Sequence, residues 1–436
     1  MTWTEPVWAE PDTLLGLLQR GRGRCREEAS MQPTVAGDLL VDCIVHDPRW
    51  DHQIEERDWL YASLAVDLGI DLVRLRAAYA GPPDPTGDAA AWLAVGVLGQ
   101  LARRGSAEAV LELCRYLRTG RDVDLALGEL IPVADHPAAQ GLLGDVLDVA
   151  DDDQLRWSIG MDLHGRTSLP QWRGANARID QAFASAAAVR AEWAAQERAQ
   201  GRVSERDLVL RAAAESNLMA PKSAADLTEA QWEVTLLAIV TDDRRCVDDS
   251  WDPRSRRALR RALEKSGSPA VLAWSRSVSR SRSDFDQKGY LEWAAFSMFT
   301  RISATASDAP RLNELFVEAA TRENDGIGDQ YELVNALARL DHFAAVTTIE
   351  NLYDTTVYAR LRRRCAAALS RLSPDFANER AVECLDDCES ETRAIAIADV
   401  DPSNGEVRAR LLRIADDPTE EDDNRRAAAE RITRRR

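Results

Sequence analysis

The sequence predicts an almost wholly α-helical protein, an α-solenoid of stacked antiparallel helix pairs with an irregular helical centre. Two observations carry this prediction. Apolar residues recur every three or four positions over most of the chain, and short turns divide these stretches into units of about thirty residues. Such a unit hides its apolar face only by stacking on its neighbours. No Asn-Gly or Asp-Gly pair lies between two runs of alternating polarity, as a β-hairpin would need.

The clearest helix is predicted over residues 89–103. Trp92, Val95, Leu98 and Leu101 follow one another there at three-residue steps, which places them on one apolar stripe. We expect all four to lie in the core.

A second helix is predicted to follow directly, over residues 107–117. Gly105 and Ser106 break the first pattern, and a serine at this place can cap the next helix through its hydroxyl oxygen. Gly120 occupies the position where a glycine commonly ends a helix. These two helices form one pair.

The same pairing recurs along the chain. The predicted pairs are 122–134 with 136–149, 331–340 with 343–353, 358–372 with 375–385, and 391–399 with 405–414. The middle of the chain is less regular and contains one long alanine-rich helix at 175–198. We therefore expect an N-terminal array at 1–165, an irregular centre at 166–286, and a C-terminal array at 287–436 whose tail caps the last repeat.

The net charge and the hydropathy of the sequence disfavour some classes of function. Of the 436 residues, 45% are hydrophobic, which is enough for a folded core. The net charge of −18 disfavours a general affinity for nucleic acid or anionic membranes. No run approaches the ~20 apolar residues of a membrane span, and the first residues lack the order of a signal peptide. We expect a cytoplasmic protein with no membrane partner.

The seven cysteines do not form a metal-binding pattern. Most lie inside apolar helical stretches, and in a reducing compartment they are expected to be free core residues. Cys384 and Cys388 are four apart with Cys365 upstream, but the five histidines are scattered far from them. We predict no metal and no cofactor.

Residues 46–59 form the densest polar and aromatic cluster. Asp47 before Pro48 predicts a helix end, and the next helix would present Asp51, Glu55 and Asp58 on one face, beside His52 and Arg57. Two carboxylates one turn apart could perform acid–base chemistry if one lost its water. The alternative is structural: Trp50, Ile54 and Tyr61 pack, and the charges pair along a solvated face.

A second cluster contains Arg156, Trp157, Asp162 and His164, followed by Trp172 and Arg173. An aromatic, a carboxylate and an arginine on successive helices resemble the HEAT-like DNA glycosylases, which hold damaged DNA in a cleft. That resemblance implies base chemistry. The alternative is that Asp162 and His164 are a charge pair at a helix end.

The third candidate is the basic stretch 254–282. Arg254, Arg257 and Arg261 fall on one helix face, where guanidinium groups could bind phosphates or an acidic segment of a partner. The alternative is that the stretch neutralises acidic neighbours of the same chain, at 242–243 and 248–249.

Motifs of known reactions are missing from the sequence. It contains no GxxxxGK[ST] phosphate loop, no GxGxxG dinucleotide motif, no HExxH and no GxSxG. This absence makes an enzyme the less favoured class.

About half of the chain resembles HEAT repeats. The helix openings Arg362-Arg363-Arg364 and Glu391-Thr392-Arg393 and the units at 89–151 carry the resemblance. Residues 38–57 look like the opening of uncharacterised HEAT-repeat domain proteins of high-GC bacteria. This resemblance implies an architecture but no reaction.

The sequence therefore favours a non-catalytic scaffold or adaptor that grips a protein or peptide on a concave solenoid face. The residues expected to bind the partner are Trp50, Asp51, Glu55, Arg57, Arg156, Trp157, Asp162, Arg254, Arg257 and Arg261. The alternative is a nucleic-acid-binding or base-processing protein that uses the central arginines. A third option is an enzyme that uses Asp51, His52 and Glu55.

Overall fold

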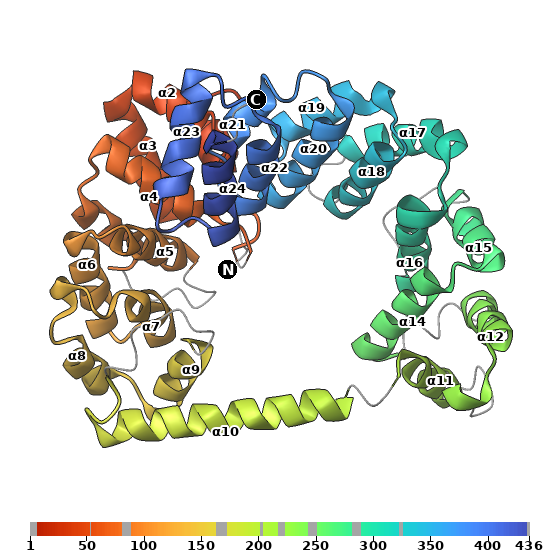
Figure 1. Ribbon diagram of the computed structural model, residues 1–436, viewed down its shortest axis with the longest axis horizontal. Helices are drawn as coiled ribbons and strands as arrows, with labels where there is room; N and C mark the ends of the chain where they lie inside the picture. The colour runs from red at the N-terminus through yellow and green to blue at the C-terminus, as the bar shows by residue number, and fades with distance from the viewer. Residues whose placement is uncertain are drawn as a thin grey trace. The chain divides into compact units, whose positions relative to one another are not determined.

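The computed structural model describes residues 7–52, 54–80, 89–162, 172–200, 204–216, 223–242, 251–280, 289–321 and 326–433. Every regular element in these residues is a helix, and no strand occurs among them, which confirms the all-α class (Figure 1). Two compact units share the chain. Unit 1 combines Met1–Ala191 with Val346–Arg436, and unit 2 is Glu192–Ala345. The expected three-part division of the chain stays a prediction.

The first part of unit 1 is a series of helices, and the last of them, α10 (Ala177–Gln200), begins in unit 1 and continues past its boundary at Ala191. Its elements are α1 (Leu14–Arg20), α2 (Cys25–Met31), α3 (Pro33–His46), α4 (Arg57–Leu68), η1 (Leu72–Ala78), α5 (Ala89–Arg103), α6 (Ala107–Arg118), α7 (Val123–Leu130), η2 (Ile131–Val133), η3 (Pro137–Ala139), α8 (Leu142–Val149), α9 (Asp152–Asp162) and α10 (Ala177–Gln200). Consecutive helices from α1 to α7 pack together, and so do alternate ones: α3 with α5, α5 with α7, α7 with α9, and α6 with α8.

The predicted pair at 89–117 is confirmed as α5 and α6. The Ser106 hydroxyl accepts the N–H of Ala109 at 3.2 Å, as a helix cap should. Three residues of the predicted stripe in α5 are buried, but Trp92 is 39% exposed, so its assignment to the core was wrong. Its indole N–H donates to Asp122 at 3.2 Å on the surface instead.

Two predicted helices are shorter than expected. The helix at 136–149 is interrupted because Gly141 takes a left-handed conformation, with φ of 91°, and α8 begins only at Leu142. The helix at 375–385 is reduced to α21 (Arg380–Cys384). Ser373 is extended before Pro374, and a turn follows in which Asn378 N–H donates to Asp375 O at 3.1 Å.

The second part of unit 1 packs against the first. It comprises α19 (Val346–Thr355), α20 (Ala359–Leu372), α21, α22 (Ser390–Asp399), α23 (Gly405–Asp416) and α24 (Asp422–Thr433). Alternate helices again contact each other, α20 with α22 and α22 with α24. One buried core runs from Leu17 in α1 to Ala186 in α10 and includes Ala359 and Cys388 from this second part. The two ends of the sequence thus form one folded body.

Unit 2 has a core of its own. Its elements are α11 (Glu205–Glu215), η5 (Ala224–Asp226), α12 (Glu229–Asp242), α14 (Pro253–Ser266), α15 (Pro269–Arg280), α16 (Tyr290–Met298), the π-helical η6 (Phe299–Ser303), η7 (Ala306–Asp308), α17 (Ala309–Ala320), α18 (Ile327–Arg339) and η9 (Phe343–Ala345). Trp232, Trp251 and Trp274 belong to a buried cluster to which α11, α12, α14, α15 and α16 contribute residues.

The described cysteines agree with the prediction of core thiols, since Cys25, Cys43, Cys114, Cys365, Cys384 and Cys388 are all buried and free. No group of three or more His, Cys, Asp or Glu in the described ranges could hold a metal ion. Over those same ranges, no helix is both long and apolar enough to cross a membrane.

Candidate functional site

The segment between α3 and α4 differs from its prediction. Asp47 ends α3, as expected, but residues 51–52 and 54–56 are not helical, and α4 begins only at Arg57. The expected helix face of Asp51, Glu55 and Asp58 was therefore wrong. The Glu55 carboxylate replaces it with a different contact, because Oε1 accepts the N–H of Asp51 at 2.8 Å and ties the segment into a loop.

Asp47 organises the start of this loop. Its carboxylate accepts hydrogen bonds from Arg49 Nη2 at 2.6 Å and meets His52 Nδ1 at 3.2 Å, and both Asp47 and Arg49 are buried. Burial alone would raise the pKa of Asp47, but the hydrogen bonds from His52 and Arg49 outweigh it and lower that pKa. The carboxylate is thus held ionised as a structural anchor.

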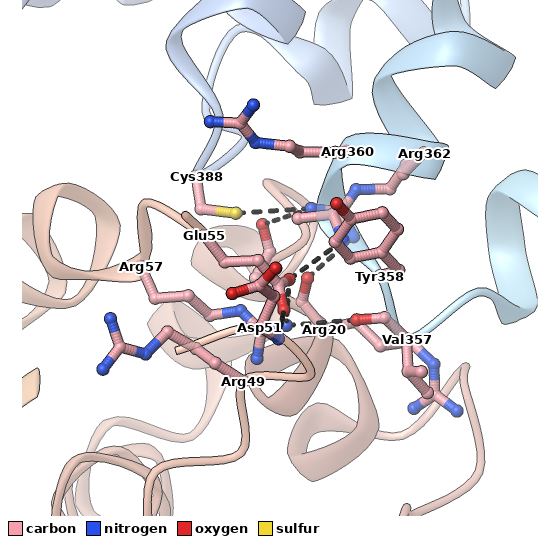
Figure 2. Close-up of polar contacts among 12 residues, drawn as sticks. Arg20, Arg49, Asp51, Glu55, Arg57, Val357, Tyr358, Arg360, Arg362 and Cys388 are labelled. Carbon is pink, nitrogen blue, oxygen red and sulfur yellow. Dashed lines mark hydrogen bonds and ion pairs between the residues drawn. The ribbon is translucent and has the colours of Figure 1, made fainter. Parts of the chain in front are cut away.

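Glu55 and Arg57 form a buried ion pair inside unit 1. Arg57 Nη2 donates to Glu55 Oε2 at 3.0 Å and to the carbonyl of Val357 at 3.2 Å, and neither charged side chain has exposed surface. The N–H of Ala359 completes the group by donating to Glu55 Oε2 at 2.9 Å. Figure 2 shows Glu55 and Arg57 directed toward the segment that carries Val357. These two predicted partner-binding residues join the two parts of unit 1.

Arg362 makes the second buried bridge between these parts. Its Nε donates to Asp387 Oδ2 at 2.8 Å, and its Nη1 donates to the carbonyl of Arg20 at 2.7 Å. Gly21 lies against this bridge with φ of 68°, and its carbonyl accepts the N–H of Cys388 at 3.1 Å. Burial raises the pKa of the Cys388 thiol well above its ordinary value, so it stays protonated and unreactive.

Two further arginines extend this network. Arg22 donates from Nε to Glu383 Oε1 at 2.8 Å, again from the first part of unit 1 to the second. Arg393 donates from Nε to Glu420 Oε2 at 2.6 Å, and its guanidinium lies 3.7 Å from the ring centroid of Trp59. Arginine, with its planar fork of donors, suits such buried pairs.

The other two predicted loop residues, Trp50 and Asp51, are half-buried, and both make further contacts. The structure thus brings Asp51, Glu55 and Arg57 together, and Trp50 directly precedes Asp51 in the chain. What it builds from Glu55 and Arg57 is an internal joint, in which neither side chain reaches solvent.

The predicted cluster of the glycosylase resemblance is only partly described. Arg156 pairs with Asp153 at 2.8 Å, and Trp157 in the same helix is 50% exposed. Asp162 lies at the end of α9, while His164 lies outside the described residues. Trp172 is buried, and Arg173 stacks on Phe183 at 4.6 Å. Of these residues, Trp157 and Arg173 are exposed, whereas Trp172 is buried.

The basic stretch is divided between two faces of α14. Arg254, Arg257 and Arg261 are exposed along one face, as predicted, and Lys265 continues the line. The opposite side packs inward: Arg256 lies over Tyr290 and Arg260 over Trp293, at 5.7 and 5.2 Å from the ring centroids. We call the four exposed residues, Arg254, Arg257, Arg261 and Lys265, the α14 stripe.

One carboxylate of unit 2 partly neutralises the α14 stripe. Glu205 on α11 accepts from Lys265 Nζ at 2.8 Å and from Arg261 Nη1 at 3.4 Å. These hydrogen bonds outweigh a smaller effect of burial and lower the pKa of Glu205. Of the acidic neighbours expected to neutralise the stretch, residues 243, 248 and 249 lie outside the described residues.

Sequence reasoning missed a pocket of about 800 Å³ in unit 1. Its wall consists of Gln100, Ala102, Arg103, Gly105, Pro132, Val133, Asp135, His136 and residues 418–422. The glycine and proline turns were visible in the sequence. The sequence did not show that these turns lie side by side, because the loop before α24 is some three hundred positions from α5. No protein-family model, no curated protein and no solved structure matches the chain.

Proposed function

We propose that this protein is a non-catalytic binding scaffold of HEAT-like solenoid architecture that grips an acidic segment of a partner protein. The architecture is supported by the packing within each part of unit 1, where contacts link consecutive and alternate helices, the pattern of stacked helix pairs. Such stacking presents a long row of exposed helix faces that can be specialised without disturbing the core.

The observation that carries the proposal is the α14 stripe. The protein has a net charge of −18, yet three arginines and a lysine lie exposed on one helix face at steps of three and four residues. Other arginines of the chain are used internally, as at Arg57 and Arg362, where neither side chain reaches solvent. An exposed guanidinium row binds carboxylates through paired hydrogen bonds, while the acidic body repels long polyanions.

The test is binding of a fluorescein-labelled acidic peptide, rich in glutamate, measured by fluorescence polarisation. Reversing two charges with R257E/R261E should weaken binding about tenfold or more, since each lost exposed pair contributes up to about 1 kcal/mol. The matched control R24E/R198E makes the same change in net charge at two other exposed arginines, one directly before α2 and one in α10. It should bind as the wild type does.

Nucleic acid is the other polyanion that an arginine row could hold, and the same assay separates the two. If a labelled single-stranded DNA binds more tightly than the peptide, with affinity that falls steeply with salt, the nucleic-acid alternative replaces the scaffold. If neither probe distinguishes R257E/R261E from the control variant, the α14 stripe is not a binding site.

A further inference from the structure

Glu205 places an internal carboxylate on the α14 stripe from a fixed position. It is the first residue of α11, and Ser204 before it caps that helix by accepting the N–H of Asp207 at 3.1 Å. Val209 and Leu210 of the same helix are buried in the core of unit 2, which holds the backbone of α11 in place. Only the side chain of Glu205 has to turn for its carboxylate to leave the stripe.

The Glu205 carboxylate bridges the two cations at the C-terminal end of the stripe. Lys265 Nζ donates to its Oε2 at 2.8 Å, and Arg261 Nη1 donates to its Oε1 at 3.4 Å. Arg261 and Lys265 are four positions apart, the spacing at which side chains of a helix are neighbours on its surface. A carboxylate of a bound partner would accept the same two hydrogen bonds, so Glu205 occupies the place of such a group.

This contact is open enough to be exchanged. The side chains of Arg261, Lys265 and Glu205 are 58%, 70% and 32% exposed, so a competing carboxylate can reach all three from solvent. Exposed ion pairs contribute little to stability, because water screens the charges and the long side chains lose freedom. Breaking the contact therefore leaves the fold of unit 2 intact.

A change of pH near neutrality does not release the contact. The hydrogen bond from Lys265 is the strongest of the effects that hold the pKa of Glu205 below its ordinary value, and the hydrogen bond from Arg261 adds to it. The carboxylate therefore stays ionised, and a competing anion is needed to displace it.

The N-terminal half of the stripe remains available. Arg257 forms no ion pair with any carboxylate in the described part of the chain. From Arg254 to Lys265 the stripe follows α14 for about 16 Å, at the usual helical rise per residue. Glu205 covers only the last turn of this row.

We propose that Glu205 is an autoinhibitory contact of the α14 stripe, whose carboxylate holds Arg261 and Lys265 until the acidic segment of a partner replaces it. The segment meets Arg257 first and then takes over the two cations that Glu205 leaves. Segments with too few carboxylates to displace Glu205 are rejected. This inference rests on the function proposed above and adds how that site is regulated.

The experiment uses the full chain and the fluorescein-labelled glutamate-rich peptide. E205Q removes the competing charge and should tighten binding about threefold to fivefold, the effect expected for one exposed ion pair. The matched control E215Q removes the same charge from an exposed glutamate of α11, about 15 Å further along the helix, and should leave the affinity unchanged. Circular dichroism melting curves establish that both variants keep the fold.

A second pair of variants separates competition from repulsion. R261Q/K265Q lacks the cations that Glu205 holds, so E205Q/R261Q/K265Q should bind the peptide no more tightly than R261Q/K265Q does. Equal tightening by E205Q in both backgrounds would mean that Glu205 only repels the peptide, which overturns the inference.

Two further results concern different parts of the argument. If R257E/R261E weakens binding but E205Q binds as the wild type does, the stripe is a binding site and Glu205 does not inhibit it. If R257E/R261E itself binds as the wild type does, the proposed function fails, and the inference fails with it.

Discussion

At the residue scale, the joint of unit 1 depends on charges that have no contact with water. Arg362 and Asp387 both have fully buried side chains, and the bridge between them is bidentate. Replacing Arg362 with methionine leaves the aspartate buried and unpaired, so R362M should lower the free energy of unfolding by about 3–5 kcal/mol. Urea denaturation followed by circular dichroism measures this change.

The matched variant R362M/D387N separates lost charge pairing from lost packing. Asparagine keeps an acceptor for the N–H of Glu389, which Asp387 Oδ1 binds at 3.0 Å, but carries no charge. The double variant should therefore be more stable than R362M. If it is no more stable, the unpaired charge is not what makes the single substitution costly.

Gly21 tests how closely the two parts of unit 1 approach. A Cβ atom at this position would lie 2.6 Å from Cys388 Sγ, and φ is 68°. Gly69 has a similar φ of 62° but open space around it. G21A should therefore be roughly 1–3 kcal/mol less stable than G69A, because only the first adds a clash to the backbone strain. Equal urea midpoints of the two variants would contradict the close approach.

Glu389 gives the joint a dependence on pH. Burial, and next the nearby carboxylate of Glu56, raise the pKa of Glu389 from an ordinary 4.5 to about 7. The pKa of Glu389 is higher in the folded state than in the unfolded state. The stability contributed by protonated Glu389 is therefore complete below about pH 4.5 and is lost as pH rises through 7. E389Q should remove this loss, which is on the order of 3 kcal/mol, and should unfold at a higher temperature than the wild type at pH 8.

The comparison for E389Q is E379Q, at an exposed glutamate before α21. Melting temperatures of all three proteins between pH 5 and pH 8 test whether ionisation of Glu389 lowers the stability. E379Q should follow the wild-type curve. A curve for E389Q that also follows the wild type would show that Glu389 does not titrate in this range.

At the scale of single elements, the sequence predicted best where the signals are local. α5 and α6 follow from a three-residue apolar period and a serine cap, and both signals lie within the helices themselves. The non-helical stretch at 54–56 could not be predicted in this way. Glu55 accepts the N–H of Ala359, 304 positions away, and no feature of the sequence near Glu55 indicates that partner.

The difference between local and long-range signals also explains which candidate sites could be predicted. The exposed face of α14 was visible in the spacing of its arginines, because one helix forms it. The pocket of unit 1 was hidden, since Gln100 and Asp422 approach only when the C-terminal helices pack on the N-terminal ones. Periodicity predicts which residues share a face, but it says little about which distant faces meet.

At the scale of the whole chain, unit 1 is discontinuous in sequence. Its core joins residues from Leu17 to Ala186 with Ala359 and Cys388, and the buried arginine pairs cross the same joint. Unit 2 lies between these segments in the sequence and buries its own cluster. Each unit should therefore fold without the other.

Fragments test this division directly. Residues 1–200 and 346–436, expressed together as separate chains, should assemble one to one and co-elute on gel filtration, with a dissociation constant of roughly 1 μM or tighter. Residues 204–345 alone should give a helical, cooperatively melting protein, because the cluster around Trp232 and Trp274 lies wholly within them. R362M in the C-terminal fragment should abolish assembly, whereas R408M at an exposed site should not. If the two fragments of unit 1 stay apart, each folded and monomeric, the joint between the ends of the chain is not part of its core.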